Sequence, residues 1–178
     1  MNEYQQVTGS NKGIGYAIVQ GLCMQFDGSV YLTSRDEERG RKAVAELNKL
    51  GYHPKYHQLD IDNEESVMRL RDHLLQEYGG LDVLVNNAGI AFCMNSSESL
   101  ATTAELTIRT NYFHTLRTYR IMFDILRDYS RVVNLTSDDG HLLKIDGQEP
   151  QATQLRARFA DPNISIESLS ELMNSYIK

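Results

Sequence analysis

A glycine-rich segment near the amino end has the spacing of a phosphate-binding loop. Residues 8–15 read TGSNKGIG, so Gly9, Gly13 and Gly15 follow a G-x-x-x-G-x-G pattern. Glycines between a strand and a helix allow a tight turn and let the backbone approach a pyrophosphate, while free N–H groups of the helix end face the phosphates. Taken without other features, a glycine-rich turn that binds nothing explains the pattern nearly as well.

The side chain at the end of the next strand chooses between two nicotinamide cofactors. An NAD site places an acidic residue there, about 20 residues past the glycines, to accept hydrogen bonds from the ribose. Here that position is Arg35, whose guanidinium can pair with a 2′-phosphate, and Lys12 adds a second positive charge. The pair favours NADP(H). Two alternatives stay open: Arg35 as a solvated charge at a helix start, and Asp36 as an acidic competitor, although helix capping explains Asp36 more simply.

Apolar periodicity predicts the elements that would position this loop. A helix is expected directly after the glycines, and Asp36 is expected to cap a second helix that ends before Gly51. Asp62 with Glu65 is expected to cap a third helix, and a long helical stretch is expected over residues 100–126. Buried strands are expected at residues 29–34, 55–61, 81–86 and 131–136.

Strand and helix alternate four times, which is the pattern of a parallel sheet with helices on both faces. We therefore expect an α/β protein with a Rossmann-type doubly wound sheet, strand order 3-2-1-4-5. Its weak element is the first strand, residues 4–7, because the polar sequence YQQV stands where an apolar central strand belongs. This favours an amino end that is trimmed or altered. After Ser137 we expect loops, a helix over 151–160 and a last helix capped by Ser165.

Composition excludes several functions. The chain has 178 residues, 18 Lys and Arg against 24 Asp and Glu, and a net charge of −6, which suits one domain without a broad basic surface. Nucleic acid is therefore not an expected partner. No apolar run approaches the roughly 20 residues of a membrane span, so we expect no membrane partner and a cytoplasmic location. Cys23 and Cys93 lack the spacing of zinc ligands, and no metal is expected.

Several segments together resemble the short-chain dehydrogenase/reductase family, and within it the NADPH-dependent carbonyl reductases. They stand in family order and at family spacing over nearly the whole chain, so they are more specific than the glycine loop alone. The matching segments are TGSNKGIG (8–15), TSRD (33–36), QLDID (58–62), LDVLVNNAG (81–89), TN (110–111) and VVNLTS (132–137).

The resemblance implies a cofactor site for NADP(H) along these segments. The glycine loop would line the pyrophosphate, Arg35 would grip the 2′-phosphate, Asp60 and Ile61 would flank the adenine, and residues 87–89 would run beside the nicotinamide ribose. The implied cofactor-binding residues are Gly9, Asn11, Lys12, Gly13, Ile14, Gly15, Arg35, Asp60, Ile61, Asn87, Ala88 and Gly89. From the residues alone, Asp60 is equally a solvated carboxylate at a strand end, and Asn87 part of an ordinary turn.

The implied reaction is hydride transfer between NADPH and a small-molecule ketone, aldehyde or quinone. Ser137, at the carboxyl end of a strand, would hydrogen-bond the substrate carbonyl, where negative charge develops. Asn111 would hold a water of the proton relay. Because asparagine is a poor helix former, its side chain is expected to be occupied, although an exposed polar helix residue is the simpler alternative.

The family's proton donor lies in a Tyr-x-x-x-Lys motif, and no tyrosine of this chain is followed by lysine four residues later. Residues 138–178 resemble the helical insert that carbonyl reductases carry between the serine and that tyrosine, and the insert implies a monomer. We therefore expect residues 1–178 to form a single NADP-binding Rossmann domain whose last strands are missing. The chain is then a truncated, weakly active or inactive reductase. Alternatives are a catalytically dead NADP-binding module and a fragment that only makes interactions.

Overall fold

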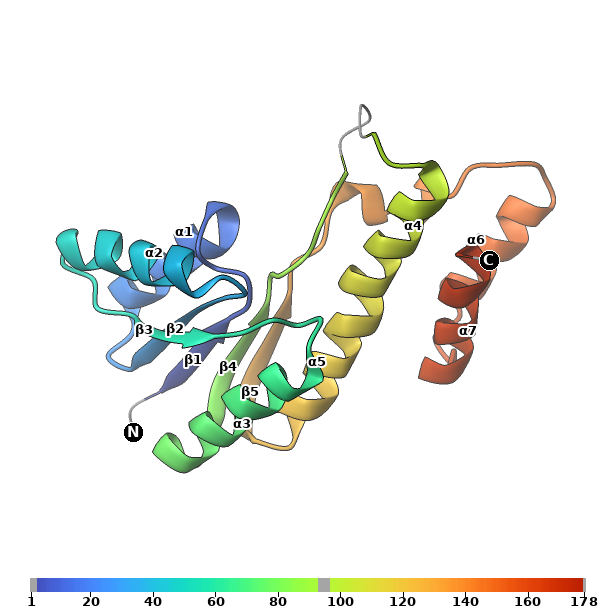
Figure 1. Ribbon diagram of the computed structural model, residues 1–178. Helices are drawn as coiled ribbons and strands as arrows, with labels where there is room; N and C mark the ends of the chain where they lie inside the picture. Colours follow the sequence, from blue (N-terminus) through green and yellow to red (C-terminus); the bar gives the residue numbers. More distant parts are fainter. Residues whose placement is uncertain (1–2, 93–96, 178) are drawn as a thin grey trace.

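Five parallel strands form the centre of the computed structural model, which describes residues 3–92 and 97–177 (Figure 1). They pair in the order β3-β2-β1-β4-β5, as expected. The strands are β1 (Tyr4–Val7), β2 (Ser29–Ser34), β3 (Lys55–Gln58), β4 (Leu81–Asn86) and β5 (Leu126–Asn134). The predicted α/β sheet is therefore confirmed.

Helices cover both faces of the sheet and enclose two separate cores. On one face, α1 (Gly13–Gln25) and α2 (Glu37–Lys49) pack through Val19 and Leu47 onto valines of β1, β2 and β4. On the other face, α3 (Glu64–Tyr78) and α5 (Thr115–Phe123) pack onto β2 and β4. Figure 1 shows the sheet between these two layers. Because the strands are parallel, their carboxyl ends lie at the same edge of the sheet. The loops that follow the strands meet at this edge.

The first strand is central despite its polar sequence. β1 pairs with β2 on one side and with β4 on the other, so Gln5 and Gln6 are both 0% exposed. The Gln6 amide donates to Thr33 Oγ1 at 3.3 Å. The Oε1 atoms of both glutamines have no hydrogen-bond partner within the described part of the chain. The sheet buries these residues because of where the strand lies, and against the preference of their side chains.

The last strand differs from the expected range 131–136. β5 begins at Leu126, which pairs with Leu81, and ends at Asn134, which pairs with Asn86. A register shift between Leu81 and Val83, with Tyr129 at φ 66°, lets the polar residues before Arg131 join the strand. The prediction missed this part because an irregular pairing has no apolar alternation.

Two further expectations were wrong in detail. The strand expected at 55–61 ends at Gln58. The third helix is capped by Asn63, whose Oδ1 accepts from the Ser66 N–H at 3.1 Å, and not by Asp62. Both residue types cap helices well, so sequence alone does not choose between neighbours.

The expected long helix is a composite. α4 (Leu100–Ile108) runs into a π-helical turn, η1 (Arg109–His114), which continues as α5. After two short 3₁₀ turns, η2 (Asp138–Gly140) and η3 (Leu142–Lys144), come α6 (Gln151–Phe159) and α7 (Ile166–Tyr176). Ser165 caps α7 as expected, accepting from the Ser168 N–H at 3.1 Å.

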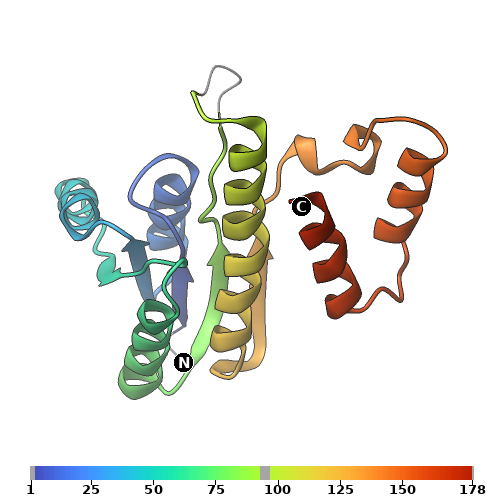
Figure 2. The ribbon, with the colours of Figure 1, turned by 45° about the vertical axis from the view of Figure 1, so that its right-hand side comes forward.

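The last two helices lie on the β5 side of the molecule, away from the sheet (Figure 2). Leu172 of α7 is 3% exposed, and Ser170 shares a hydrogen bond of 3.0 Å with the Tyr112 hydroxyl. This bond attaches α7 to the π-helical turn. Within residues 3–92 and 97–177, no helix has the length and apolar character needed to cross a membrane.

Candidate functional site

The glycine loop connects β1 to α1 and packs against the loop that follows β4. Gly9 has φ +60°, and a Cβ there would lie 2.9 Å from Ala88 Cα. A Cβ on Gly15 would lie 2.4 Å from Asn87 Nδ2 and 2.8 Å from Ser10 Cα. Both positions therefore require glycine, Gly9 for its backbone conformation and both for the close approach of the two loops.

A threonine hydroxyl and an asparagine amide join these two loops. Thr8 Oγ1 accepts the backbone N–H groups of Asn87 and Ala88, each at 2.8 Å. In return, Asn87 Nδ2 donates to the carbonyl oxygens of Thr8 and Gly9, at 2.8 and 3.0 Å. Thr8 was not among the predicted site residues, although a threonine directly after a strand and before a glycine loop is a signal in the sequence.

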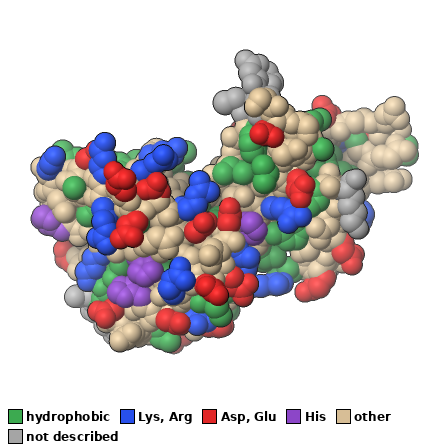
Figure 3. All heavy atoms as spheres, viewed as in Figure 1, with side chains coloured by type: hydrophobic (Ala, Val, Ile, Leu, Met, Phe, Trp, Pro, Cys, Tyr) green, Lys and Arg blue, Asp and Glu red, His purple; other side chains and the backbone are tan. Residues whose placement is uncertain are grey.

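The loops frame a cleft of about 410 Å³ at the carboxyl edge of the sheet. Every residue expected to bind the cofactor lines it, from Gly9 in the first loop to Gly89 in the last. The cleft also includes residues that the sequence did not suggest: Leu59, Asp62, Ile90 and Thr110. The space-filling view in Figure 3 shows the surface hollowed between the α1–α2 side and the α4 side.

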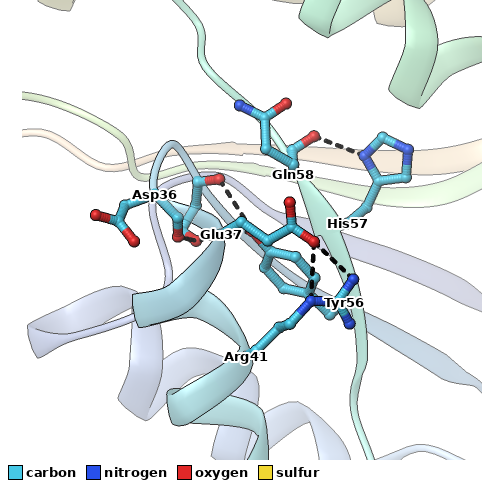
Figure 4. Close-up of polar contacts among 7 residues, drawn as sticks. Asp36, Glu37, Arg41, Tyr56, His57 and Gln58 are labelled. Carbon is cyan, nitrogen blue, oxygen red and sulfur yellow. Dashed lines mark hydrogen bonds and ion pairs between the residues drawn. The ribbon is translucent and has the colours of Figure 1, made fainter.

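The basic residues near this cleft fall into two groups. Arg41 donates through Nε and Nη2 to Glu37 Oε1, at 2.9 and 2.7 Å, and lies over the Tyr56 ring (Figure 4). Arg39 lies 3.5 Å from the Asp36 carboxylate, whose other oxygen caps α2 as expected. Lys12 and Arg35, which line the cleft, make no ion pair with any described residue.

Asp60, Ile61 and Asp62 form the wall of the cleft after β3. Ile61 lines the cleft and is otherwise buried in the core, with 7% of the residue exposed. Asp60 Oδ1 accepts the Asp62 N–H at 3.0 Å, and the Asp60 N–H donates to Ser66 Oγ at 3.0 Å. The Asp60 carboxylate thus shapes its own loop.

A second cleft of about 750 Å³ adjoins the first, and the two share Ile14 and residues 87–90. Asn111 and Ser137, the two residues expected to be catalytic, both line it. The structure therefore brings the expected catalytic residues next to the expected cofactor residues.

Both polar atoms of the Asn111 side chain are hydrogen-bonded, as its position in a helix suggested. Its Oδ1 accepts from the Ile90 N–H and its Nδ2 donates to the Ile90 carbonyl, both at 2.8 Å. These bonds hold the loop after β4 against the π-helical turn, a kind of insertion that is frequent at functional sites. The π-helical turn itself was not predicted.

Ser137 follows β5 and is exposed. Its Oγ accepts the Asp139 N–H at 3.2 Å, which starts the 3₁₀ turn η2. The hydroxyl hydrogen is free to rotate toward another acceptor in the second cleft.

The thiols and histidines form no metal centre in the part of the chain described. No group of three or more His, Cys, Asp or Glu side chains there is arranged to hold an ion. Burial raises the pKa of the Cys23 thiol, which disfavours the reactive thiolate. Cys93 lies outside the described residues.

The strand order, the glycine loop after β1 and the cleft at the carboxyl edge define a Rossmann-type α/β protein. The family model for short chain dehydrogenase matches residues 5–148. The chain belongs to the short-chain dehydrogenase family.

Named relatives agree with this assignment. The chain is 45% identical to carbonyl reductase (NADPH) 1 of Mus musculus and 43% identical to that of Homo sapiens, each over 172 residues. These matches cover 97% of this chain and 61% of each relative, so the chain spans less than two thirds of their length. Salutaridine reductase from Papaver somniferum superimposes with a TM-score of 0.87 at 26% identity, over 99% of this chain and 70% of that one.

Proposed function

We propose that the chain binds NADPH in the first cleft and belongs to an oxidoreductase that reduces ketones, aldehydes or quinones to alcohols. One observation carries the proposal: every expected cofactor residue lines a single cleft, and two of them, Lys12 and Arg35, are cations without an ion pair to any residue that the structure describes. The carbonyl reductase relatives, named for NADPH, support the same cofactor.

The residues of the cleft fit such a ligand. Gly13, the first residue of α1, lines the cleft with open space where a Cβ would lie, so a pyrophosphate could approach the backbone N–H groups at the start of this helix. Lys12 and Arg35 have no carboxylate partner among the described residues, and a bound phosphate dianion would be an anionic partner for both. Ile61, which lines the cleft, would provide apolar contact for a base.

The second cleft supports the reductase half of the proposal. NADPH, when bound, supplies a hydride. Ser137 would donate its hydroxyl hydrogen to the carbonyl oxygen, where hydride addition builds negative charge. Asn111 would keep the loop after β4 in place through Ile90, and a water held beside it would take part in proton delivery. The partner is thus a small-molecule carbonyl compound.

Activity of the 178 residues by themselves is proposed to be low. None of the tyrosines is followed by lysine four residues later, so the chain offers no proton donor of the family type. Loss of a general acid lowers rates by about 10²–10⁴-fold. The same observation favours the second candidate function, an NADP-binding module without catalysis. We further propose that residues 1–178 act as one NADP-binding domain, monomeric and cytoplasmic.

Ligand titration tests the cofactor half. We expect the chain to bind NADPH more tightly than NADH, and Arg35→Ala to weaken NADPH binding by about 10- to 100-fold while NADH binding changes little. Arg39→Ala is the matched control, because its guanidinium already pairs with Asp36. Fluorescence of the bound nicotinamide reports both affinities. Equal affinity for NADPH and NADH in the unaltered chain contradicts the proposal.

NADPH oxidation with a quinone or an aromatic aldehyde tests the catalytic half. Binding without turnover supports the module; slow turnover that falls further in Ser137→Ala supports a weakly active reductase. Turnover at the rate of a full-length reductase contradicts the proposed low activity.

A further inference from the structure

We propose that His114 is a positioning residue for the adenine half of the cofactor site, because its Nδ1 lies 2.6 Å from Asp62 Oδ1 and ties the loop after β3 to the π-helical turn. The proposal rests on the proposed NADPH site. It gives a function to Asp62, which lines that site, and to His114, which contacts Asp62. His114 and Asp62 are 52 residues apart in the chain, so their contact is a product of the fold.

The loop concerned carries the proposed adenine wall. Asp60, Ile61 and Asp62 all line the first cleft. β3 ends at Gln58 and α3 begins at Glu64. At the start of the loop between them, the Leu59 N–H donates to the Ser34 carbonyl oxygen and the Asp60 N–H to Ser66 Oγ, both at 3.0 Å. Figure 1 shows this connection passing beside α5 before it enters α3. The Ile61 carbonyl and the Asp62 carboxylate are bonded to the helix, which can therefore set where this part of the wall stands.

Two side chains of the helix hold the loop. His114 donates from Nδ1 to the Asp62 carboxylate, which accepts only, and the imidazole is three-quarters buried with 23% of its side chain exposed. Three residues further on, Arg117 Nη2 donates to the Ile61 carbonyl oxygen at 2.6 Å. One bond fixes the side chain of the loop, and the other fixes its backbone.

The same helix face holds the opposite wall. Asn111, three residues before His114, makes both of its hydrogen bonds to Ile90 in the loop after β4. Residues 111, 114 and 117 thus connect one helix to both sides of the first cleft. The Asn111 contacts concern the nicotinamide side, whereas those of His114 concern the adenine side. The two contributions are therefore separable with ligands that contain one half alone.

Affinities for NADPH and for 2′,5′-ADP, which contains the adenine half without the nicotinamide, test the proposal. His114→Leu removes the donor at similar size and is expected to weaken both ligands by the same factor, about fivefold to tenfold. His114→Asn restores an N–H near the position of Nδ1 and is expected to bind both within about twofold of the unaltered chain. His53→Leu, at an exposed site before β3, is the matched control.

The affinities of the variants decide whether His114 positions the adenine half of the site. If His114→Leu binds both ligands normally, or weakens NADPH but not 2′,5′-ADP, the positioning role is overturned. If His114→Asn binds as poorly as His114→Leu, the histidine acts through packing, and the hydrogen bond is not the cause. If the unaltered chain binds neither ligand, the proposed function itself fails, which is a distinct outcome.

Discussion

β1 and β5 both pair with β4 and both carry several polar residues, yet they are opposite in burial. β1 carries two glutamines that are 0% exposed, whereas β5 exposes 46% of Val133 and 98% of Tyr129. The difference comes from position, since β1 has a strand on each side and β5 stands at the end of the sheet. Burial in this sheet thus follows topology more closely than side-chain polarity.

The contrast extends to the loops that follow the two strands. After β1, the glycine loop is tied to the loop after β4 by Thr8 and Asn87. After β5, Ser137 is exposed and bonded to Asp139 in its own turn. The proposed cofactor half is therefore closely packed, while the proposed substrate half is open.

The largest effect is expected where the β1 side is most tightly packed. Gly15→Ala places a Cβ 2.4 Å from Asn87 Nδ2, so the free energy of unfolding should fall by about 1–3 kcal/mol and NADPH affinity by more than about tenfold. Gly21→Ala, in the same helix with nothing within 4 Å of the new Cβ, should raise stability by about 0.5–1 kcal/mol. Urea denaturation and ligand titration measure both. Similar stability of the two variants contradicts the close packing of the loops.

A smaller effect on stability is expected from substitutions within β1 and β5 themselves. Gln5→Met removes a buried amide whose Oε1 has no partner in the described structure, so stability should rise by about 1 kcal/mol. Val133→Thr in β5 is expected to change stability by less than about 0.5 kcal/mol, because the side chain is half exposed. The denaturation midpoints of the two variants, compared at an unchanged dependence of the unfolding free energy on denaturant, measure both effects. A loss of stability in Gln5→Met shows instead that the amide is well satisfied.

The smallest effect concerns β3, at the opposite end of the sheet. Burial lowers the pKa of His57 below its usual 6.5, and the nearby His73 ring acts in the same direction. The folded state therefore binds fewer protons than the unfolded chain, and this contribution to stability is present above about pH 6.5 and is lost as the pH falls. His57→Asn should reduce the loss between about pH 7.5 and pH 5.5 by a few tenths of a kcal/mol. Denaturation at the two pH values measures it; an unchanged difference contradicts the assignment.

The parts of the fold that depend on local sequence could be predicted. The glycine spacing located the loop, and Asp36 and Ser165 were recognised as caps. The strand order followed from the alternation of strands and helices, with the glycine loop at the carboxyl end of the first strand. A neighbouring capping residue, Asn63, was missed because Asp62 satisfies the same rule. The start of β5 was missed because its pairing is irregular around Tyr129.

The parts that depend on contacts between distant residues could not be predicted. The occupied side chain of Asn111 was expected, but its partner, Ile90, lies 21 residues away. The π-helical turn adds a residue to one helical turn without a marker in the sequence. The contact of His114 with Asp62 depends on how the π-helical turn η1 lies beside the loop after β3.

The Thr8 hydroxyl, which accepts two N–H groups from the loop after β4, has a thermodynamic consequence for ligand association. The chain orders both loops when it folds, so little conformational entropy is left to lose on meeting a nucleotide. Calorimetric entropy of association should then reflect released water and ligand flexibility, and the encounter should proceed without a slow rearrangement of the protein.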